Sequence, residues 1–416
     1  MDLSYGPEYD EFRAEVREFC RNHRPAKHRS RGIPGVTERP NPDVLAWQAK
    51  LIEHGYAART IPKEHGGYGA KPDIIESRII QEEFLAAGLP LGLSNQGISM
   101  LVPTLLEVGT AEQCAAYIRP TIYGEMIWCQ GYSEPGAGSD LASLRTRAEL
   151  DGDDWVINGQ KIWTSSAHVA DMCFILVRTE PEAPKHHGIS YLLMPMDRPG
   201  IDIRPLVTMT GDATFNEVFL NDVRIPAKNI VGARGQGWHV ANVTLKYERG
   251  MLGSADQGQS GIKGLVELLQ EETVGSGRAM DLDHYRDRLL RLQGRTLANK
   301  YHGMRLLSQS INGEQTGTEG LITKLSATEL AYDIYSLGVD VLGETGTLYN
   351  GSPYQAERDW QKSLLGCFTG IIGGGSANIQ RNIIAERGLG LPREPQVRFD
   401  NGRWEMMPSA SNKGGN

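Results

Sequence analysis

Apolar side chains in the first third of the chain recur at the spacing of one helix face. Between Pro7 and Asn22 they fall at Tyr9, Phe12, Val16, Phe19 and Cys20, a pattern that predicts an amphipathic helix. The same periodicity predicts helices from Pro42 to about Gly55 and over Asp73–Ala87, Ser94–Glu107 and Thr110–Ile118. We therefore expect residues 1–124 to form an N-terminal helical domain.

Two of these helices begin with recognisable signals. Asn41 can cap a helix whose first turn holds Pro42, and Thr110 with Gln113 has the spacing of a capping box. The basic segment Arg24–Gly35 and the glycine-rich segment Ile61–Gly69 are expected to be loops.

The pattern changes at Glu125 to short segments rich in β-branched and aromatic residues, separated by turn residues at Asp151, Asn158 and Pro199. Strands are predicted over Arg145–Glu149, Asp171–Thr179, Gly188–Pro195 and Phe215–Leu220. A run of strands without intervening helices predicts a β-sandwich or barrel over residues 125–235.

Helical periodicity returns beyond Trp238. Helices are predicted over Val240–Leu252, Ser260–Glu271, His284–Ser308, Leu321–Gly338 and Pro353–Cys367, with a polar loop at Thr273–Asp281. Helices of that length suggest a C-terminal bundle over residues 236–395, followed by a polar tail, 396–416. The predicted fold class is α+β and multidomain: helical domain, β domain, helical bundle.

Composition narrows the functional classes. The 416 residues include 40% apolar and 23% charged residues, and the net charge of −8 argues against a nucleic-acid-binding protein. Five cysteines without a CxxC pair suggest a reducing compartment and no zinc site. The acidic first residues and the lack of any long apolar run predict neither a secretory signal nor membrane insertion. We expect a cytoplasmic enzyme.

Three blocks carry the candidate chemistry: WCQGYSEPGAGSD (Trp128–Asp140), NGQKIWTSS (Asn158–Ser166) and IIGGGSANIQRNIIAERGLGLP (Ile371–Pro392). Glycines in the first block let the backbone approach a ligand, and its serines offer donors. Composition alone would favour a polar turn between strands. In this order and at these distances, however, the blocks resemble the acyl-CoA dehydrogenase family of flavoproteins, from roughly Pro7 to Pro392.

The resemblance implies an FAD-dependent enzyme that removes the α-proton and the β-hydride of an acyl-CoA thioester, leaving a trans-2-enoyl-CoA. This chemistry requires a base at the α-carbon and donors on the thioester oxygen. The implied partners are the acyl-CoA substrate and an electron-transfer flavoprotein. Family members are usually dimers of dimers, so a homotetramer or a heterotetramer with a homologue is expected.

Carried over by position, the resemblance assigns cofactor contacts to Gln130, Tyr132, Ser133, Trp163, Thr164, Ser165, Ser376 and Asn378, and a CoA contact to Ser139. Tyr132 and Ser133 would act partly through main-chain groups. Trp163 would lie beside the isoalloxazine; the alternative is a core tryptophan on a strand.

The third block departs from the family at the base. Many members carry a glutamate where this chain has Gly374. A glycine cannot accept a proton, but its backbone N–H can still donate to the thioester oxygen. Isovaleryl- and long-chain-type members instead carry the base before an arginine on the first long C-terminal helix, where Glu248 and Arg249 stand. We expect Glu248 to be the base and Arg249 to steady a loop or the substrate; the alternative for Glu248 is a surface carboxylate.

Two further segments depart from the family. Gly275–Met280 replaces an Arg-x-Phe-Gly loop; Arg278 could meet the FAD pyrophosphate or be an exposed loop arginine. Asp340–Gly346 stands where the family has a glutamine and a glycine-rich turn. The resemblance assigns a cofactor contact to Gly343, and Asp340, in place of the glutamine, could also contact the adenine side of FAD. No Rossmann GxGxxG motif is present.

The altered base position accompanies branched, long or cyclic substrates in the family, and we expect such a substrate here. Three alternatives stay open. One is a catalytically silent or FAD-sharing subunit of a hetero-oligomer, which Gly374 favours, and another is an acyl-CoA oxidase or flavin monooxygenase on the same fold. The third is a helical scaffold protein, against which the three matching blocks argue.

Overall fold

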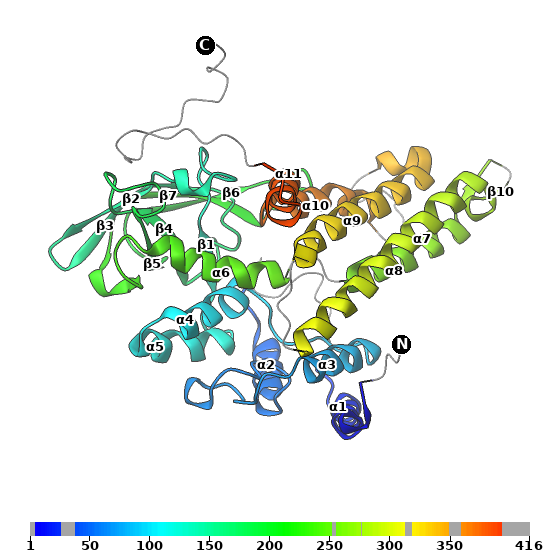
Figure 1. Cartoon of the computed structure of the whole chain (residues 1–416), viewed down its shortest axis with the longest axis horizontal. Coiled ribbons are helices and arrows are strands. Elements are labelled where there is room, and N and C mark those ends of the chain that lie inside the picture. Colours follow the sequence, from blue (N-terminus) through cyan, green and yellow to red (C-terminus); the bar gives the residue numbers. More distant parts are fainter. Residues whose placement is uncertain are drawn as a thin grey trace, which may run out of the picture. The chain divides into compact units, whose positions relative to one another are not determined.

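The computed structural model describes residues 5–25, 38–251, 255–275, 277–312, 318–348 and 359–392. The chain divides into two compact units, one mainly of residues up to Tyr247 and the other mainly of residues from Glu248 onward (Figure 1). Each unit has its own hydrophobic core.

The first unit opens with the predicted helices, which are α1 (Asp10–Asn22), α2 (Pro42–Glu53), α3 (Ile74–Ala86), α4 (Val102–Val108) and α5 (Ala111–Ile122). Both predicted start signals are confirmed: the Asn41 side chain accepts from the Val44 N–H at 3.0 Å, and the capping box of Thr110 is complete. Most of the basic segment Arg24–Gly35 lies outside the described residues.

The predicted helix over Ser94–Glu107 begins differently. Residues Gly97–Leu101 form a π-helical turn that runs directly into α4. Gly97 lies against the indole of Trp128, where a Cβ would stand only 2.7 Å from the Trp128 side chain. The periodicity of apolar residues does not distinguish a π turn from an α turn, so the sequence predicted an ordinary helix.

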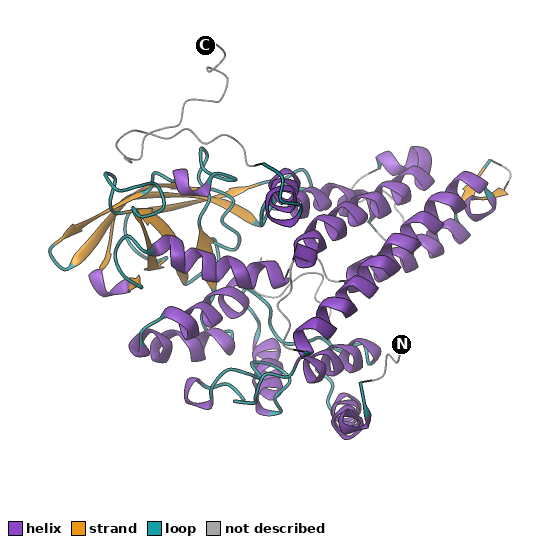
Figure 2. Cartoon of the chain, in the orientation of Figure 1, coloured by secondary structure: helices purple, strands orange, loops and turns teal. Residues whose placement is uncertain are grey.

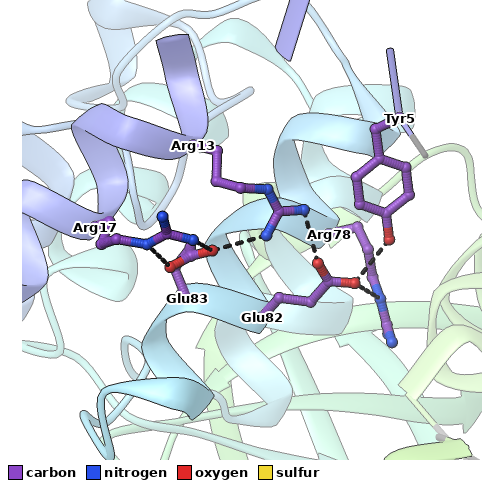
Figure 3. Close-up of polar contacts among 6 residues, drawn as sticks. All are labelled: Tyr5, Arg13, Arg17, Arg78, Glu82 and Glu83. Carbon is purple, nitrogen blue, oxygen red and sulfur yellow. Dashed lines mark hydrogen bonds and ion pairs between the residues drawn. The ribbon is translucent and has the colours of Figure 1, made fainter. Parts of the chain in front are cut away.

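An arginine–glutamate network joins α1 to α3 (Figure 3). Arg13 and Arg17 on α1 both donate to the Glu83 carboxylate, at 2.7 and 2.9 Å, and Arg13 also donates to Glu82 at 2.9 Å. The side chain of Glu83 is only 8% exposed. Hydrogen bonds from Arg17 and Arg13 outweigh its desolvation and hold the pKa of Glu83 below its usual value.

The middle of this unit is a β-sheet with strands β1 (Trp128–Gly131), β2 (Arg147–Asp151), β3 (Asp154–Lys161), β4 (Met172–Arg178), β5 (Ile189–Pro195), β6 (Ile201–Leu206), β7 (Phe215–Pro226) and β8 (Ile230–Val231). The order is β6-β7-β3-β2-β4-β5-β8, and β1 pairs in parallel with β4. The strands predicted from the sequence are present, with β7 longer than expected; β1, β3, β6 and β8 were not predicted.

The turn predicted at Asn158 is wrong. Asn158 and Gly159 lie inside β3, opposite β2 and β7, at a register shift between Ile157 and Gly159. The β2–β3 hairpin turns earlier, where Gly152 adopts a positive φ of 65°. An Asn-Gly pair signals a hairpin only when the strands on its two sides pair with each other, and these do not.

Two halves of the sheet share one core. β2 and β4 meet at the single residue pair Arg147–Arg178. Apolar side chains from both sides of this junction, Trp155, Ile157 and Val223 with Ile175, Leu192 and Met194, form one buried cluster. The other face of β4 and β5 packs against the N-terminal helices through residues such as Phe174, Tyr191 and Ile118. The predicted β region between helical regions is thus confirmed.

Helix α6 (Gly237–Met251) follows the sheet, and the second unit holds α7 (Ala255–Glu271), α8 (Asp283–Ile311), α9 (Ile322–Leu342), α10 (Trp360–Ile372) and α11 (Ala377–Ile383) (Figure 2). Its core includes Leu265, Leu292, Ile334 and Trp360. The predicted loop Thr273–Asp281 contains a small hairpin of β9 (Thr273–Val274) and β10 (Gly277–Arg278). The helix predicted over Pro353–Cys367 is α10, which begins at Trp360 because the Asp359 side chain caps it by accepting from the Lys362 N–H at 2.9 Å; residues 353–358 lie outside the described residues.

Close packing of α9 on α10 depends on Gly338. A Cβ at this position would lie 2.1 Å from the indole of the buried Trp360. Neither the helix backbone nor the ring can accommodate that distance without a shift.

We predict that Gly338→Ala destabilises the second unit by about 1–3 kcal/mol, because overpacking forces backbone and rotamer shifts. Gly366→Ala on α10 is the matched control, since no atom lies within 4 Å of its added Cβ. It should be neutral or stabilising by up to about 1 kcal/mol through helix propensity. Denaturant unfolding of both variants measures the difference, and equal stabilities would contradict this account of the α9–α10 contact.

We predict that Glu83→Gln lowers the free energy of unfolding at neutral pH by about 1–2 kcal/mol, a figure reduced for the half-exposed Arg17. The pKa of Glu83 is lowered by folding, so its contribution is present above the unfolded-state pKa and is lost as pH falls through the folded-state pKa. The difference from wild type should therefore shrink below about pH 4. Glu18→Gln, at an exposed position of α1, serves as control; a constant difference at all pH values would refute the assignment.

Candidate active site

A buried ion pair joins the first motif block to the second. The Glu134 carboxylate lies 2.8 Å from the Lys161 ammonium, with side chains 8% and 1% exposed. Glu134 also accepts from the N–H groups of Arg145 and Thr146, at 2.7 and 2.9 Å. Burial raises the pKa of Glu134, but the Lys161 charge and these donors more than offset it and the pKa stays below its usual value. Both residues lie within the motif blocks, but this role was not predicted for either of them from the sequence.

The same ammonium orients the predicted flavin contact at Ser133. Lys161 donates to the Tyr132 carbonyl at 3.1 Å. The peptide is trans, so the Ser133 N–H points opposite to that carbonyl and away from Lys161. No acceptor for this N–H is found among the described residues, while the Ser133 carbonyl accepts from the Ile162 N–H at 2.9 Å. A fixed, unpaired main-chain donor therefore stands at this position.

Side chains of the first block play different parts. The Tyr132 ring is buried and packs edge-on against Phe174 and Tyr191, so its side chain belongs to the core of the unit. The side chain of Gln130, on β1, accepts from Gln96 Nε2 at 3.4 Å. Gln96 precedes the π-helical turn, a feature common at functional sites. No motif in the sequence pointed to Gln96.

Trp163 is not the core tryptophan of the alternative interpretation. It follows β3, its side chain is 57% exposed, and its φ of 59° lies in the left-handed region. Ser166 has a similar φ of 65°. Such conformations cost of order 1–3 kcal/mol for residues other than glycine and concentrate at functional sites. An exposed indole with the Phe215 ring edge at its side, 6.0 Å between centroids, offers a stacking surface to a planar ligand.

The segment after Trp163 is anchored to the start of β7 through Asn216. Thr164 and Asn216 exchange two backbone hydrogen bonds of 3.1 Å, and Asn216 Nδ2 also donates to the Thr164 carbonyl at 3.0 Å. The Thr164 hydroxyl is buried and has no hydrogen-bond partner within the described parts of the chain. A buried hydroxyl without a hydrogen-bond partner destabilises the fold by about 1–3 kcal/mol unless a ligand supplies that partner. Ser165 lies half-buried beside it. Asn216 was not predicted from the sequence as a residue of this region.

Ser139 is exposed on the turn that ends the first block. The next residue, Asp140, accepts from the Lys185 ammonium at 2.6 Å. Buried Arg178 holds the two segments together by donating to the carbonyls of Ala142 and Lys185, at 2.6 and 2.7 Å. Ser139 is therefore carried on a braced turn with charged neighbours.

In the second unit the third block forms a glycine turn between α10 and α11. Gly374 and Gly375 have φ values of 61° and 91°, a conformation that favours glycine at both positions. The Ser376 hydroxyl caps α11 by accepting from the Ile379 N–H at 3.4 Å, and Asn378 accepts from Arg381 at 3.5 Å.

The other predicted positions of this unit are spread over different elements. Arg278 is exposed on β10. Gly343 ends α9 with a φ of 55° and open space around it. Asp340 pairs with Arg288 of α8 at 2.8 Å, which gives this residue a structural partner within the bundle.

Glu248 and Arg249 lie near the end of α6 by their backbone, and their side chains lie outside the described residues. The residue before them is fixed: the Tyr247 hydroxyl donates to Glu107 of α4 at 2.9 Å. Residues of the first two blocks thus come together in one unit, and those of the third block belong to the other.

Within the described ranges, no group of histidine, cysteine or carboxylate side chains is arranged to hold a metal ion. Of the helices that the structure describes, none has the length and apolar character needed to cross a membrane.

Comparison with known proteins covers nearly the whole chain. Models of the acyl-CoA dehydrogenase N-terminal, middle and C-terminal domains match residues 6–125, 129–223 and 235–389. Acyl-CoA dehydrogenase IpdE1 of Mycobacterium tuberculosis is 40% identical over 390 residues, which is 92% of this chain and 98% of that protein. The human mitochondrial short-chain specific acyl-CoA dehydrogenase is 29% identical over 342 residues, 80% of this chain and 79% of that protein.

Solved structures of similar proteins match this chain over nearly its whole length. The ChsE4-ChsE5 complex of Mycobacterium tuberculosis contains a chain 32% identical, with a TM-score of 0.76, covering 95% of this chain and 100% of that one. The Tcur3481-Tcur3483 steroid ACAD gives 31% identity and a TM-score of 0.77 at the same coverage. The unpaired Ser133 N–H, the exposed Trp163 ring and the orphaned Thr164 hydroxyl fit a flat cofactor with a polar edge. The chain belongs to the acyl-CoA dehydrogenase family of FAD-binding oxidoreductases, as its three sequence blocks predicted.

Proposed function

We propose that this protein dehydrogenates an acyl-CoA thioester between its α- and β-carbons, giving the trans-2-enoyl-CoA and passing the electrons to an electron-transfer flavoprotein. The observation that carries the proposal is the pair of motif loops locked together by Glu134 and Lys161. Near this ion pair are the directed Ser133 N–H, the exposed Trp163 indole and the Thr164 hydroxyl without a partner. The resemblance to the family assigns cofactor contacts to these three residues.

FAD, when bound, supplies the hydride acceptor. In the first unit we assign its contacts to Gln130, the main chain of Tyr132 and Ser133, the Trp163 ring, Thr164 and Ser165. In the second unit we assign them to Arg278, Gly343, Ser376 and Asn378. The Ser133 N–H and the Thr164 hydroxyl would each gain the partner that the protein does not provide.

For the proton transfer we propose Glu248 as the base and the Gly374 N–H as a donor to the thioester oxygen. A donor on that oxygen lowers the pKa of the α-proton, and a partly desolvated carboxylate rises toward it. The bond from Tyr247 to Glu107 supports this assignment, because it anchors the helix end that carries Glu248. Arg249 would steady the loop or substrate, and Ser139 would contact the CoA moiety.

We propose a bulky, ring-containing acyl group as the substrate. Gly374 leaves no carboxylate at the position that many family members use, which is the departure that accompanies branched, long or cyclic substrates. One structural neighbour of 31% identity is described as a steroid ACAD, so a steroid-derived acyl-CoA is the first substrate class to test.

We propose assembly as a tetramer, either of this chain alone or with a homologue. Two structural neighbours are described by pairs of names, ChsE4-ChsE5 and Tcur3481-Tcur3483. Gly374 also favours a second candidate function, an FAD-sharing subunit whose partner supplies the base. Purification of this chain alone without bound flavin, and with flavin only when a homologue is co-expressed, would support that second candidate.

We predict that Glu248→Gln strongly slows reduction of the flavin while leaving ligand binding intact. Under anaerobic conditions a panel of acyl-CoAs should bleach the visible absorbance of the wild-type flavin. The variant should bleach about 10²–10⁴-fold more slowly, because a glutamine cannot accept the α-proton, yet show a spectral shift on binding. Glu267→Gln, on α7, is the control. Equal bleaching in variant and wild type would assign the base to another residue, and rapid reoxidation in air would favour an oxidase.

We predict that a steroid-derived acyl-CoA bleaches the wild-type flavin at least about tenfold faster than butyryl-CoA, since pocket contacts with the larger group add transition-state binding. Stopped-flow absorbance with both compounds measures the ratio. A preference for the short straight chain would contradict the proposed substrate class without affecting the proposed reaction.

A further inference from the structure

Lys324 lies at a position that is unfavourable for a positive charge. It lies in the first turn of α9 and is only 6% exposed. Burial penalises an ammonium, and the positive end of a helix dipole disfavours it further. Its Nζ donates to the Gly373 carbonyl at 2.7 Å and to the Gly375 carbonyl. One buried charge thus holds both carbonyls that flank Gly374.

These two bonds determine where the N–H groups of Gly374 and Ser376 point. In a trans peptide the C=O and the N–H lie in one plane and point in opposite directions, and no cis peptide occurs in the described chain. Because the Gly373 carbonyl faces Lys324, the Gly374 N–H faces away from it. The Gly375 carbonyl fixes the Ser376 N–H in the same way. The Gly374 N–H has no acceptor in any part of the chain that the structure describes.

Three consecutive glycines cannot hold such a direction unaided. Glycine populates positive and negative φ with similar ease, so a free Gly373–Gly375 segment would sample many orientations of its peptide planes. Gly374 and Gly375 both adopt positive φ here, and the Lys324 bonds fall on either side of them. The lysine therefore supplies the order that the side chains of this segment cannot.

The positive charge has a second effect on the same peptide. A cation on the Gly373 carbonyl polarises the amide, and hydrogen bonds in a chain strengthen one another. The Gly374 N–H is consequently a stronger donor than an ordinary amide. Aim and donor strength both depend on Lys324.

We propose that Lys324 is a positioning residue for substrate activation: it aims and polarises the Gly374 N–H toward the carbonyl oxygen of the bound thioester. This inference rests on the proposed function, in which the Gly374 N–H is a donor to that oxygen. Lys324 itself touches no reacting atom; it acts through the Gly373–Gly374 peptide.

The test is a binding measurement that needs no turnover. The FAD-loaded protein is titrated with 4-(dimethylamino)cinnamoyl-CoA, whose absorption band moves to the red when its carbonyl oxygen accepts a hydrogen bond. Wild type should give a large red shift. Lys324→Met, which keeps the length of the side chain but not its charge, should lose most of that shift. Lys263→Met, at an exposed position of α7 in the same unit, is the matched control and should behave as wild type.

The anaerobic reduction rate should fall with the shift, by about 10–100-fold in Lys324→Met, which is less than complete removal of an oxyanion donor. The affinity for the probe should change less than about threefold, because the donor acts mainly on the activated carbonyl. If Lys324→Met does not fold, Lys324→Gln decides the matter: it retains a neutral donor and should give a reduced shift.

A full red shift and full reduction rate in the lysine variant would overturn the role of Lys324 while leaving the proposed function intact. No red shift in wild type that is nevertheless reduced by acyl-CoA would show that the Gly374 N–H is not the donor, which also overturns this role. No reduction and no shift in wild type would refute the proposed function itself. The three outcomes are distinguishable.

Discussion

The arrangement of the β region depends on one buried ion pair, that of Glu134 and Lys161. Two charges removed from water repay their desolvation only when the remaining donors and acceptors are satisfied. Here the carboxylate accepts two backbone N–H groups besides the ammonium, and the ammonium reaches the Tyr132 carbonyl. The ion pair thereby holds the first and second motif blocks next to each other, and together they form one surface. The surface includes strained and exposed groups, such as Trp163, that local propensity would not select.

In each of the two units a buried lysine donates a hydrogen bond to a backbone carbonyl. Lys161 binds the carbonyl before the Ser133 N–H, and Lys324 binds the carbonyl before the Gly374 N–H. Main-chain donors have no rotamers of their own, so a separate group must set their direction. A charged side chain on the opposite end of the same peptide does this without occupying the space in front of the N–H. The direction of each of these main-chain donors thus depends on one particular side chain.

Local signals in the sequence were sufficient for much of the fold. The capping residues Asn41 and Thr110 and the helical periodicities are short-range features, and the structure confirms them. The interpretation failed where the deciding partner is distant: Asn158–Gly159 is a strand because β2 and β7 lie on either side of it. The three blocks identified the family. The contacts of Gln96, Asn216 and Lys324 were not predicted, because each involves residues that only the folded chain brings near.

The π-helical turn at Gly97–Leu101 has a consequence for how this site could vary among related sequences. A π turn accommodates one extra residue relative to an α-helix. Loss of one residue from this turn would restore α-helical register and rotate the preceding segment by about 100° relative to α4. Gln96 would then no longer face Gln130. A single-residue deletion, rather than a substitution, is thus the smallest change that would re-aim this edge of the site while preserving the packing of α4.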